Sequence, residues 1–443
     1  MQANEREMIA RRAVERSRAD QTEVRVSSSD EALTRFTHGI SNQNVAGDDA
    51  TIAVRAIVDG RTGVAASNDL SDASVDALLD RAREMASFAP RDPLVPKLPS
   101  GGSAGAPPGC YVEATAKADP SERARVCDAI ISQAELAHYW CSGYVSSASN
   151  GTTIANSSGA LASFDGTDAQ VNVKTTAPDS TGFAEHYTTD IRELDGDAAG
   201  ARAVELARMS AHPRSVKPGA WTVILEPPAF GELLTYLVSH FSAQAFSDGS
   251  SFCSDGLDRT YFDERVTISD DYGHPLAPSM PFDYEGQPKL RVPLVEAGVV
   301  RDIVTDSYYA KKLDRPNTGH ALPAPNAYGP QPLNIVIPAG SKSTQELIAS
   351  TQRGLLISRF WYIRVVDQKR AIVTGMTRDG TFLIEDGKVA GGVRNLRFNQ
   401  SIIEALGSVE FGSEQKRSGQ YSYSLVVPTA KIDKFTFTST TEF

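Results

Sequence analysis

The segment from Pro227 to Ser247 carries the side chains that are best placed for chemistry. Within it, Glu232, Tyr236 and His240 follow one another at intervals of four residues, and this spacing places them on one side of an α-helix. A glutamate and a histidine that share a helix face can act as a general base or bind a metal ion. A surface helix with an isolated histidine is the simpler interpretation of the same residues.

The remaining histidines and the cysteines show none of the spacings that are typical of a zinc site. His274 closely follows Asp270 and Asp271, but the Asp, Gly and Pro residues around it favour a turn over metal binding. The sequence has no G-x-S-x-G motif, no P-loop and no dinucleotide-binding glycine motif. Its four cysteines lack C-x-x-C spacing and predict free, buried thiols in a reducing compartment.

A strand and a helix must position the side chains of the first segment. Residues Trp221–Leu225 have the composition of a buried β-strand, and Pro227-Pro228 follows where the first turn of a helix tolerates proline. Apolar residues then recur at i, i+3, i+4, i+7, i+8 and i+11, which is the pattern of one buried stripe. They are Phe230, Leu233, Leu234, Leu237, Val238 and Phe241. We therefore expect a helix with a buried back and a front that carries the glutamate and the histidine.

The composition is that of a globular protein with two or three domains. The chain has 443 residues, of which 41% are hydrophobic and 22% charged. Its 44 basic and 55 acidic side chains give a net charge of −11, which argues against nucleic acid or an anionic membrane as the main partner. The N-terminus lacks the apolar core of a secretion signal, and no stretch approaches about 18 consecutive apolar residues. We expect a cytoplasmic protein without membrane contact.

Residues 1–215 are expected to form an α+β domain on an antiparallel sheet. Two β-meander and helix segments are joined by a Pro- and Gly-rich linker at 89–109. Asn150-Gly151 and Asp165-Gly166 are interpreted as turns. The predicted strands are Thr22–Val26, Leu33–Thr37, Thr51–Val58, Thr62–Ala66, Tyr144–Ala148, Thr152–Asn156, Ala160–Phe164, Val171–Thr175 and Phe183–Thr188. The predicted helices are Glu5–Arg18, Ser71–Met85, Asp119–His138 and Ala198–Ala211.

Residues 216–443 are expected to form a β-rich domain, a barrel or sandwich, that opens with the strand-helix unit. Glu296–Gly298 and Glu385–Gly387 have the composition of hairpin turns. The predicted strands are Val266–Ser269, Leu290–Val295, Val299–Asp302, Leu333–Ile337, Ala371–Thr374, Thr381–Ile384, Ser422–Val427 and Asp433–Thr438. Two short helices are predicted at Ser343–Ser350 and Gln400–Leu406. The fold class expected for the whole chain is α+β.

Several segments of the C-terminal half, taken together and in order, resemble the TldD/TldE (PmbA) family, whose members form zinc-dependent peptidase complexes. No single segment decides the resemblance, and residues 1–215 agree in element order more than in residues. The segments are Trp221–Phe246, Ser250–Phe252, Val266–Asp271, Pro281–Gly286, Tyr308–Leu313, Asn317–Ala321, Val373–Gly375, Phe382–Gly387, Val426–Pro428 and Lys431–Asp433. The resemblance implies that residues 216–443 are a metallopeptidase-like domain.

The family has two kinds of chain, and this sequence resembles the kind without a zinc motif. In the TldD kind, the helix carries H-E-x-x-x-H, and a cysteine near the C-terminus completes the zinc site. Here Thr235 stands at the first histidine, Tyr236 at the glutamate and His240 at the second histidine. No cysteine follows Cys253, and the corresponding C-terminal position falls near Ser413. One histidine binds zinc too weakly, and a tyrosine with a pKa of about 10 is a poor base near neutrality.

The resemblance implies a TldE/PmbA-like, non-catalytic subunit of a zinc metallopeptidase complex that acts on unfolded or short peptides. We expect no cofactor in this chain and no catalytic residues of its own, because zinc and its glutamate base would come from a TldD-type partner. The partner would form a heterodimer or larger assembly with this chain; a homodimer of this chain is the alternative. Candidates for the vestigial site or peptide cleft are Glu232, Thr235, Tyr236 and His240.

Two hypotheses from other classes stay open. A self-sufficient hydrolase with a relocated site would use His240 with Glu232, or His274 with Asp270 and Asp271. A homodimeric protein that binds peptides or acts as a scaffold would need no catalytic partner.

Overall fold

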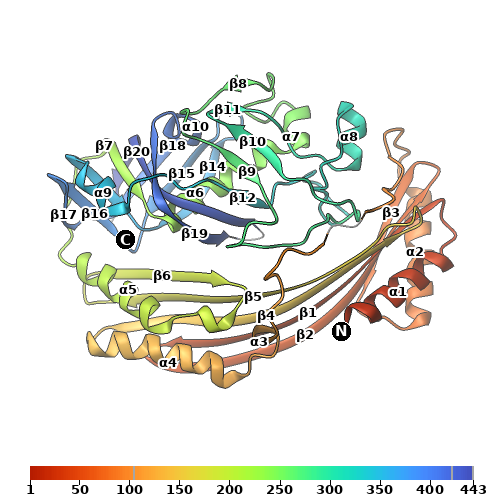
Figure 1. Ribbon diagram of the computed structural model, residues 1–443, viewed down its shortest axis with the longest axis horizontal. Helices are drawn as coiled ribbons and strands as arrows, with labels where there is room; N and C mark the ends of the chain where they lie inside the picture. Colours follow the sequence, from red (N-terminus) through yellow and green to blue (C-terminus); the bar gives the residue numbers. More distant parts are fainter. Residues whose placement is uncertain (103–104, 421–422, 442–443) are drawn as a thin grey trace.

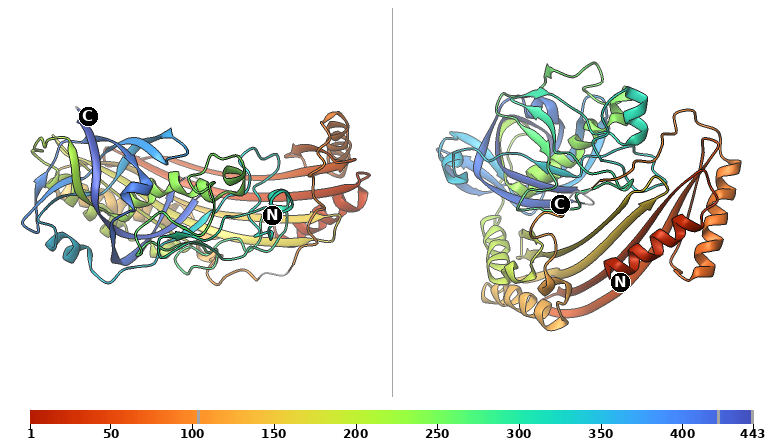
Figure 2. Two further views of the ribbon diagram at one scale, coloured as in Figure 1. Left: turned by 90° about the horizontal axis from the view of Figure 1, so that it is seen from above. Right: turned by 45° about the vertical axis from the view of Figure 1, so that its right-hand side comes forward.

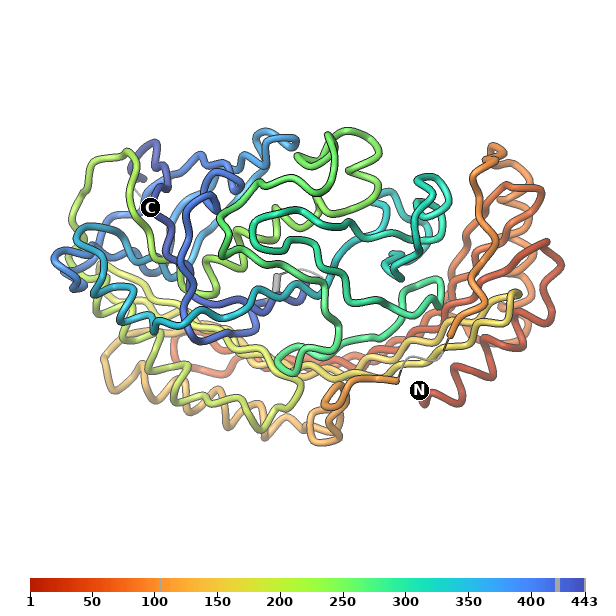
Figure 3. Tube along the Cα trace, turned by 45° about the horizontal axis from the view of Figure 1, so that its top comes forward, coloured from red at the N-terminus to blue at the C-terminus, as the bar shows by residue number. Residues whose placement is uncertain are grey.

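A computed structural model describes residues 1–102, 105–420 and 423–441 of the chain. These residues form an antiparallel sheet of six strands from the N-terminal half and a mixed sheet of 14 strands from the C-terminal half. The predicted α+β class is confirmed. Figure 1 shows the C-terminal region resting on the concave face of the curved N-terminal sheet, and the tube in Figure 3 shows the same arrangement from above. No helix within the described ranges is long and apolar enough to cross a membrane.

The N-terminal sheet has the strand order β3-β2-β1-β4-β5-β6, with antiparallel pairing throughout. Its strands are β1 (Gln21–Thr37), β2 (Ile40–Val58), β3 (Arg61–Ser67), β4 (Trp140–Asn156), β5 (Leu161–Thr176) and β6 (Thr181–Thr188). The helices are α1 (Ala3–Arg16), α2 (Asp72–Phe88), α3 (Glu113–Ala116), α4 (Pro120–Leu136), η1 (Ile191–Glu193) and α5 (Gly196–Met209). They lie on the convex side of the sheet (Figure 1, Figure 2), and α5 also reaches the C-terminal region, where its Arg202 pairs with Glu226 at 2.6 Å. The concave face is thereby left for the rest of the chain.

Strands β4 and β5 correct the prediction of turns at Asn150-Gly151 and Asp165-Gly166. Both dipeptides lie inside unbroken strands and face each other, with Asn150 paired to Gly166 and Gly151 to Asp165. The buried side chain of Arg6 explains these residue types. Its guanidinium pairs with Asp165 at 2.6 Å, and a Cβ at Gly151 would lie 2.2 Å from its Nη1 atom. Gly151 therefore leaves space for the buried side chain of Arg6, and Asp165 pairs with it; neither residue forms a turn.

Strands β1 and β2 correct the prediction in the same way, because each runs unbroken where we expected two strands or a polar loop. The helix starts follow the sequence more closely. Asp119 forms a capping box with Glu122 at the start of α4, and the Ser71 side chain accepts a hydrogen bond from the Ser74 backbone at the start of α2. The expectation of free, buried thiols is confirmed for all four cysteines.

The C-terminal sheet surrounds helix α6 (Pro227–Val238), which packs against strands β19 and β20. Its first strands are β7 (Gly219–Leu225), β8 (Arg259–Thr260), β9 (Ile268–Asp270), β10 (Val292–Glu296), β11 (Val299–Val300), β12 (Asn334–Val336) and β13 (Arg353–Ile357). They are followed by β14 (Phe360–Asp367), β15 (Ile372–Thr377), β16 (Thr381–Glu385), β17 (Lys388–Gly392), β18 (Leu396–Ser401), β19 (Val409–Gln420) and β20 (Tyr423–Thr440). Pairs β7–β13 and β12–β20 are parallel, so the sheet is mixed.

Strands β8, β13, β14, β17, β18 and β19 were not predicted from the sequence. Both predicted hairpin turns are confirmed, since they join β10 to β11 and β16 to β17. The predicted strand Ser422–Val427 begins at Ser422, which lies outside the described residues, and its other residues belong to β20. The short helices of this region are α7 (Ala243–Ser247), α8 (Ser307–Leu313), α9 (Thr344–Ala349) and α10 (Ile402–Ala405).

The helix predicted from Pro227 along the apolar stripe to Phe241 ends earlier, at Val238. After α6 the chain forms a 3-10 turn, η2 (Ser239–Phe241), and Ser242 then caps the separate helix α7. The Val304 backbone N–H donates to the Phe241 carbonyl, and the Ala243 N–H donates to the Val304 carbonyl. These bonds to a separate segment stabilise the interruption between the two helices. The apolar stripe continues through the break because both helices bury residues in one core, so periodicity alone could not reveal it.

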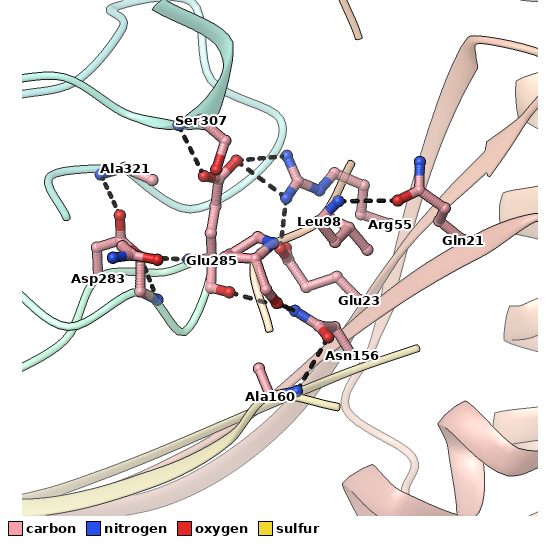
Figure 4. A network of polar contacts seen from close by, with 12 residues as sticks. Gln21, Glu23, Arg55, Leu98, Asn156, Ala160, Asp283, Glu285, Ser307 and Ala321 are labelled. Carbon is pink, nitrogen blue, oxygen red and sulfur yellow. Dashed lines mark hydrogen bonds and ion pairs between the residues drawn. The ribbon is translucent and has the colours of Figure 1, made fainter. Parts of the chain in front are cut away.

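A polar junction ties the two sheets together where β1, β2 and β4 approach the loop of residues 283–285 (Figure 4). The Arg55 guanidinium pairs with Glu23 of its own sheet and with Glu285 of the C-terminal region, the latter at 3.1 Å. Asn156 donates from Nδ2 to the backbone carbonyl of Pro99 at 2.8 Å. Burial raises the pKa of Glu23 to about 7, although the charge of Arg55 opposes this shift. The junction is thus a buried, charged connection between the regions.

Candidate functional site

A cavity of about 1500 Å³, here called the chamber, lies between the concave face of the N-terminal sheet and the C-terminal region. This volume exceeds the range of about 300–1,000 Å³ that is typical of small-molecule pockets. Charged residues that line it include Asp168, Glu185, Glu232, Arg359, Arg364 and Arg417. Aromatic residues that line it include Tyr144, Tyr187, Tyr236, Trp361, Tyr362 and Tyr423.

Two carboxyl groups enter the chamber from opposite regions of the chain. Glu232, on α6, is only 6% exposed, and its Oε2 atom has no hydrogen-bond partner among the described residues. Glu185, on β6, accepts hydrogen bonds from the hydroxyls of Tyr187 at 3.3 Å and Ser418 at 3.4 Å. Gly231 brings α6 close to β19, since a Cβ there would lie 2.8 Å from the Ser418 hydroxyl. The local sequence therefore lets a helix carboxyl and a strand carboxyl face one cavity.

Burial keeps both carboxyl groups protonated to unusually high pH. It raises the pKa of Glu232 to about 8 and that of Glu185 to about 7. The positive charge of Arg359 lowers both pKa values, and the charge of Glu185 raises that of Glu232 further. Near neutral pH the chamber wall therefore carries carboxyl groups that can gain or lose a proton.

Arg359 is held in place by groups other than these two carboxyls. Its Nη1 atom pairs with the buried Asp379 at 3.1 Å, and its guanidinium lies 3.8 Å from the ring centre of Phe183 and 4.7 Å from that of Trp361. Asp379 also accepts a hydrogen bond from Thr181 of β6 at 2.7 Å. Arg359 is thus part of a fixed connection between the two regions and contributes a positive field to the chamber.

The four candidate residues of α6 and η2 do not all reach the chamber. Glu232 and Tyr236 line it, and the Tyr236 hydroxyl donates to the carbonyl of Ile363 at 2.8 Å. Thr235 is buried, and its hydroxyl donates to the Gly231 carbonyl at 3.1 Å. His240 is 1% exposed and is not among the lining residues. The predicted alignment of Glu232, Tyr236 and His240 on one helix face is therefore wrong for His240.

His240 lies in a hydrophobic environment behind the helix. Its Nδ1 atom accepts a hydrogen bond from the Phe252 backbone at 3.4 Å, and the two rings pack at 5.3 Å between centres. Burial lowers the pKa of His240 to about 4, so the ring is neutral near physiological pH. Because His240 does not enter the chamber and Glu232 does, the arrangement gives no support to a hydrolytic pair of these two residues.

Comparison with known proteins identifies the family. The family model described as "PmbA/TldA metallopeptidase C-terminal domain" matches residues 218–439, and that described as "PmbA/TldA metallopeptidase domain 1" matches residues 22–86. The first match alone covers half of the chain. The chain belongs to the PmbA/TldD metallopeptidase family. The predicted resemblance to TldD/TldE (PmbA) proteins is thus confirmed.

Individual relatives agree with this family. The fold is similar to the crystal structure of TldE from Thermococcus kodakarensis, with a TM-score of 0.87 and 21% identity over 97% of this chain and 99% of that one. A protein named "Metalloprotease" from Methanothermobacter thermautotrophicus is 28% identical over 239 residues, 52% of this chain and 49% of that protein. A "Zinc metalloprotease TldD homolog" from Saccharolobus solfataricus is 32% identical over 108 residues, 24% of each chain. The matched region spans about half or less of the two named metalloprotease relatives.

Thr235, Tyr236 and His240, which the family resemblance aligned with a zinc motif, do not fit a zinc ion. Thr235 and Tyr236 offer hydroxyls that are engaged by backbone carbonyls, and His240 turns its ring toward Phe252. Ser413, near the position of the family's C-terminal cysteine, is exposed on β19, and its backbone N–H donates to the Lys342 carbonyl. Within the described ranges, no group of three or more His, Cys, Asp or Glu side chains is arranged to hold a metal ion.

The second relocated site considered from the sequence is not assembled either. The ring of His274 accepts a hydrogen bond from the Leu276 backbone, while Asp271 pairs with Arg291. Asp270 instead lies 3.2 Å from the Nε2 atom of His320 in the protein interior.

Two chamber residues, Glu185 and Arg359, were not predicted from the sequence. No local motif marks them, and only the meeting of the two regions brings them to the chamber that α6 lines.

Proposed function

We propose that this chain is a non-catalytic, TldE/PmbA-like subunit of a TldD/TldE-type zinc metallopeptidase complex that processes unfolded or short peptides. In this proposal the chain holds no cofactor, and zinc and the glutamate base are supplied by a TldD-type partner. The chain contributes walls of the peptide-binding space.

The observation that carries the proposal is the arrangement of Thr235, Tyr236 and His240. Each side chain at a motif position has a structural partner: a carbonyl of its own helix, a carbonyl of β14, or the ring of Phe252. A catalytic zinc site needs three protein ligands, an open position and a base that handles the proton of the water. The three side chains supply neither the ligand set nor the base.

Peptide binding is supported by the free strand edges at the chamber. Strand β14 pairs only with β15 among the described strands, and residues 40–50 of β2 pair only with β1. On β14, Trp361 is 38% exposed and Tyr362 is 61% exposed, and both line the chamber. An unpaired edge binds an extended peptide through main-chain hydrogen bonds without reading its sequence. This mode suits a complex that accepts unfolded peptides.

Zinc content and assembly state test the proposal. The purified chain, a TldD-type chain from the same organism and the co-expressed pair are analysed by native mass spectrometry and elemental analysis. We expect the pair to associate and to hold about one zinc per TldD-type chain, and the chain alone to hold none. About one zinc per chain in the isolated protein, lost in His240→Ala but kept in the exposed-histidine control His212→Ala, would contradict the proposal.

A further inference from the structure

Glu232 and Glu185 bring unused hydrogen-bond acceptors to one cavity. The Oε2 atom of Glu232 has no hydrogen-bond partner among the described residues, although the residue is only 6% exposed. Leaving a buried polar atom unpaired is costly, and a ligand that donates a hydrogen bond would remove that cost. The bonds to Glu185, at 3.3 and 3.4 Å, are long for O–H donors. Both carboxyl groups can therefore accept further hydrogen bonds.

The cations already near this pair do not satisfy it. Arg359 pairs with Asp379, and Arg417 of β19 pairs with Asp168 at 2.6 Å. Among the described residues, neither arginine forms an ion pair within 4.0 Å with Glu232 or Glu185. Their ion pairs are with Asp379 and Asp168. The aromatic rings of Tyr187 and Tyr236 line the same cavity, and such rings attract cations through their π-faces.

We propose that Glu232 and Glu185 form a subsite that binds a primary ammonium group of a peptide, either a lysine side chain or a free N-terminus. The subsite rests on the proposed peptide binding, and it selects peptides by their ammonium group. An ammonium group has three donors on one compact centre, and the carboxyl groups of Glu232 and Glu185 offer it acceptors that enter one cavity from a helix and a strand. A metal ion fits less well, since no third His, Cys, Asp or Glu ligand joins the pair within the described ranges.

The subsite has a defined dependence on pH. The groups that act on Glu232 are Glu185 from β6 and Arg359 before β14, and burial outweighs both. The carboxyl groups bind a cation only when they have lost their protons. Affinity for the ammonium group therefore rises as the pH increases from about 6 to about 8, and binding releases protons. A peptide without an ammonium group shows no such increase.

Fluorescence anisotropy with the full chain tests this subsite. The probes are one short labelled peptide with a single lysine and a free N-terminus, and its forms acetylated at the lysine, at the N-terminus or at both. At a pH of about 8 we expect the doubly acetylated form to bind about tenfold more weakly, as for loss of one charged hydrogen bond. The two singly acetylated forms show which ammonium group the subsite takes. Equal affinity of the free and doubly acetylated forms would overturn the proposal.

Four further comparisons sharpen the outcome. Glu232→Gln is expected to abolish the preference for the ammonium form, and Glu185→Gln to reduce it, whereas Glu264→Gln, at an exposed glutamate, keeps it. A preference that survives in Glu232→Gln overturns the assignment. If the singly acetylated forms show that the subsite takes the lysine, a peptide with arginine in its place that binds as tightly overturns it too. If Glu232→Gln fails to fold, the acetylation series on the native chain still decides. An ammonium preference without peptidase activity of any complex would refute only the proposed function.

Discussion

Glu232 and His240 lie eight residues apart, and burial favours the uncharged form of each side chain. Burial raises the pKa of Glu232 to about 8, so the carboxyl keeps its proton near neutrality. It lowers the pKa of His240 to about 4, so the imidazole stays without one. The side chains have similar exposure but different surroundings, since Glu232 lines the chamber and His240 packs on Phe252. Only Glu232 can exchange a proton with a bound ligand.

The raised pKa of Glu232 predicts a pH-dependent effect of Glu232→Gln on stability. In the unfolded chain this carboxyl ionises near 4.5, whereas in the folded chain it stays protonated up to about 8. The native protein thus loses stability relative to Glu232→Gln as the pH rises through this window, by about 3–5 kcal/mol in total. Urea unfolding of both proteins at the two ends of the window measures the change. An unchanged difference between them would contradict the prediction, and Glu264→Gln serves as the exposed control.

Restoring the family motif on α6 is expected to leave zinc binding absent. In the double variant Thr235→His with Tyr236→Glu, the second histidine of the motif, His240, still lies behind the helix, where its Nδ1 atom accepts from Phe252. The ligand set therefore stays incomplete. Elemental analysis after incubation with zinc and removal of excess metal checks this. A stoichiometric zinc ion would show that the break after Val238 can rearrange.

At the scale of elements, the packing of β6 against α5 depends on a glycine. A Cβ at Gly182 would lie 2.1 Å from the Ala203 carbonyl oxygen and 2.4 Å from the Ala207 nitrogen. Both are backbone atoms of α5 and cannot move away as a flexible side chain would. Gly182→Ala is expected to lower the free energy of unfolding by about 1–3 kcal/mol through overpacking. Thermal or urea unfolding measures the change. Gly47→Ala, with open space around it on β2, is the matched control and should cost little.

The sequence allowed the elements to be predicted better than their lengths. Alternation and caps identified α2, α4, β3 and β6, because each is decided by residues close in the chain. The long strands β4 and β5 were divided, because Gly151 and Asp165 have turn-forming types whose real cause is the distant Arg6. In the same way, local periodicity identified Glu232 and Tyr236 as site residues. It could not identify Glu185 and Arg359, which reach the chamber only when the two regions meet.

At the scale of the molecule, the chamber exists because buried polar contacts hold the two regions together. Arg55 is the centre of one such junction, between Glu23 and Glu285 (Figure 4). A second junction joins Asp379 to Thr181 and Arg359. The Arg55–Glu285 ion pair and the Thr181–Asp379 hydrogen bond both cross from the N-terminal sheet to the C-terminal region. Their loss should affect both stability and the shape of the chamber.

Arg55→Met is therefore expected to lower the free energy of unfolding by about 3–5 kcal/mol, because it leaves two carboxylates buried without their partner. The loss should grow with pH, since without the charge of Arg55 the pKa of the buried Glu23 rises further, whereas in the unfolded chain this carboxyl ionises near 4.5. Urea unfolding at pH values below and above the pKa of Glu23, about 7, measures both effects. The control Arg12→Met removes an exposed ion pair with Asp72 and should cost less than about 1 kcal/mol. Equal costs in the two variants would refute the role of the junction.

Peptidase activity tests most directly the central claim that this chain shapes the chamber while its partner supplies the zinc chemistry. Cleavage of an unfolded peptide is measured with the chain alone, the TldD-type partner alone and the co-expressed pair. We predict no cleavage by the chain alone, strong cleavage by the pair, and unchanged turnover when the chain carries His240→Ala. Cleavage by the isolated chain that persists after metal chelation, or that His240→Ala abolishes, would contradict this claim.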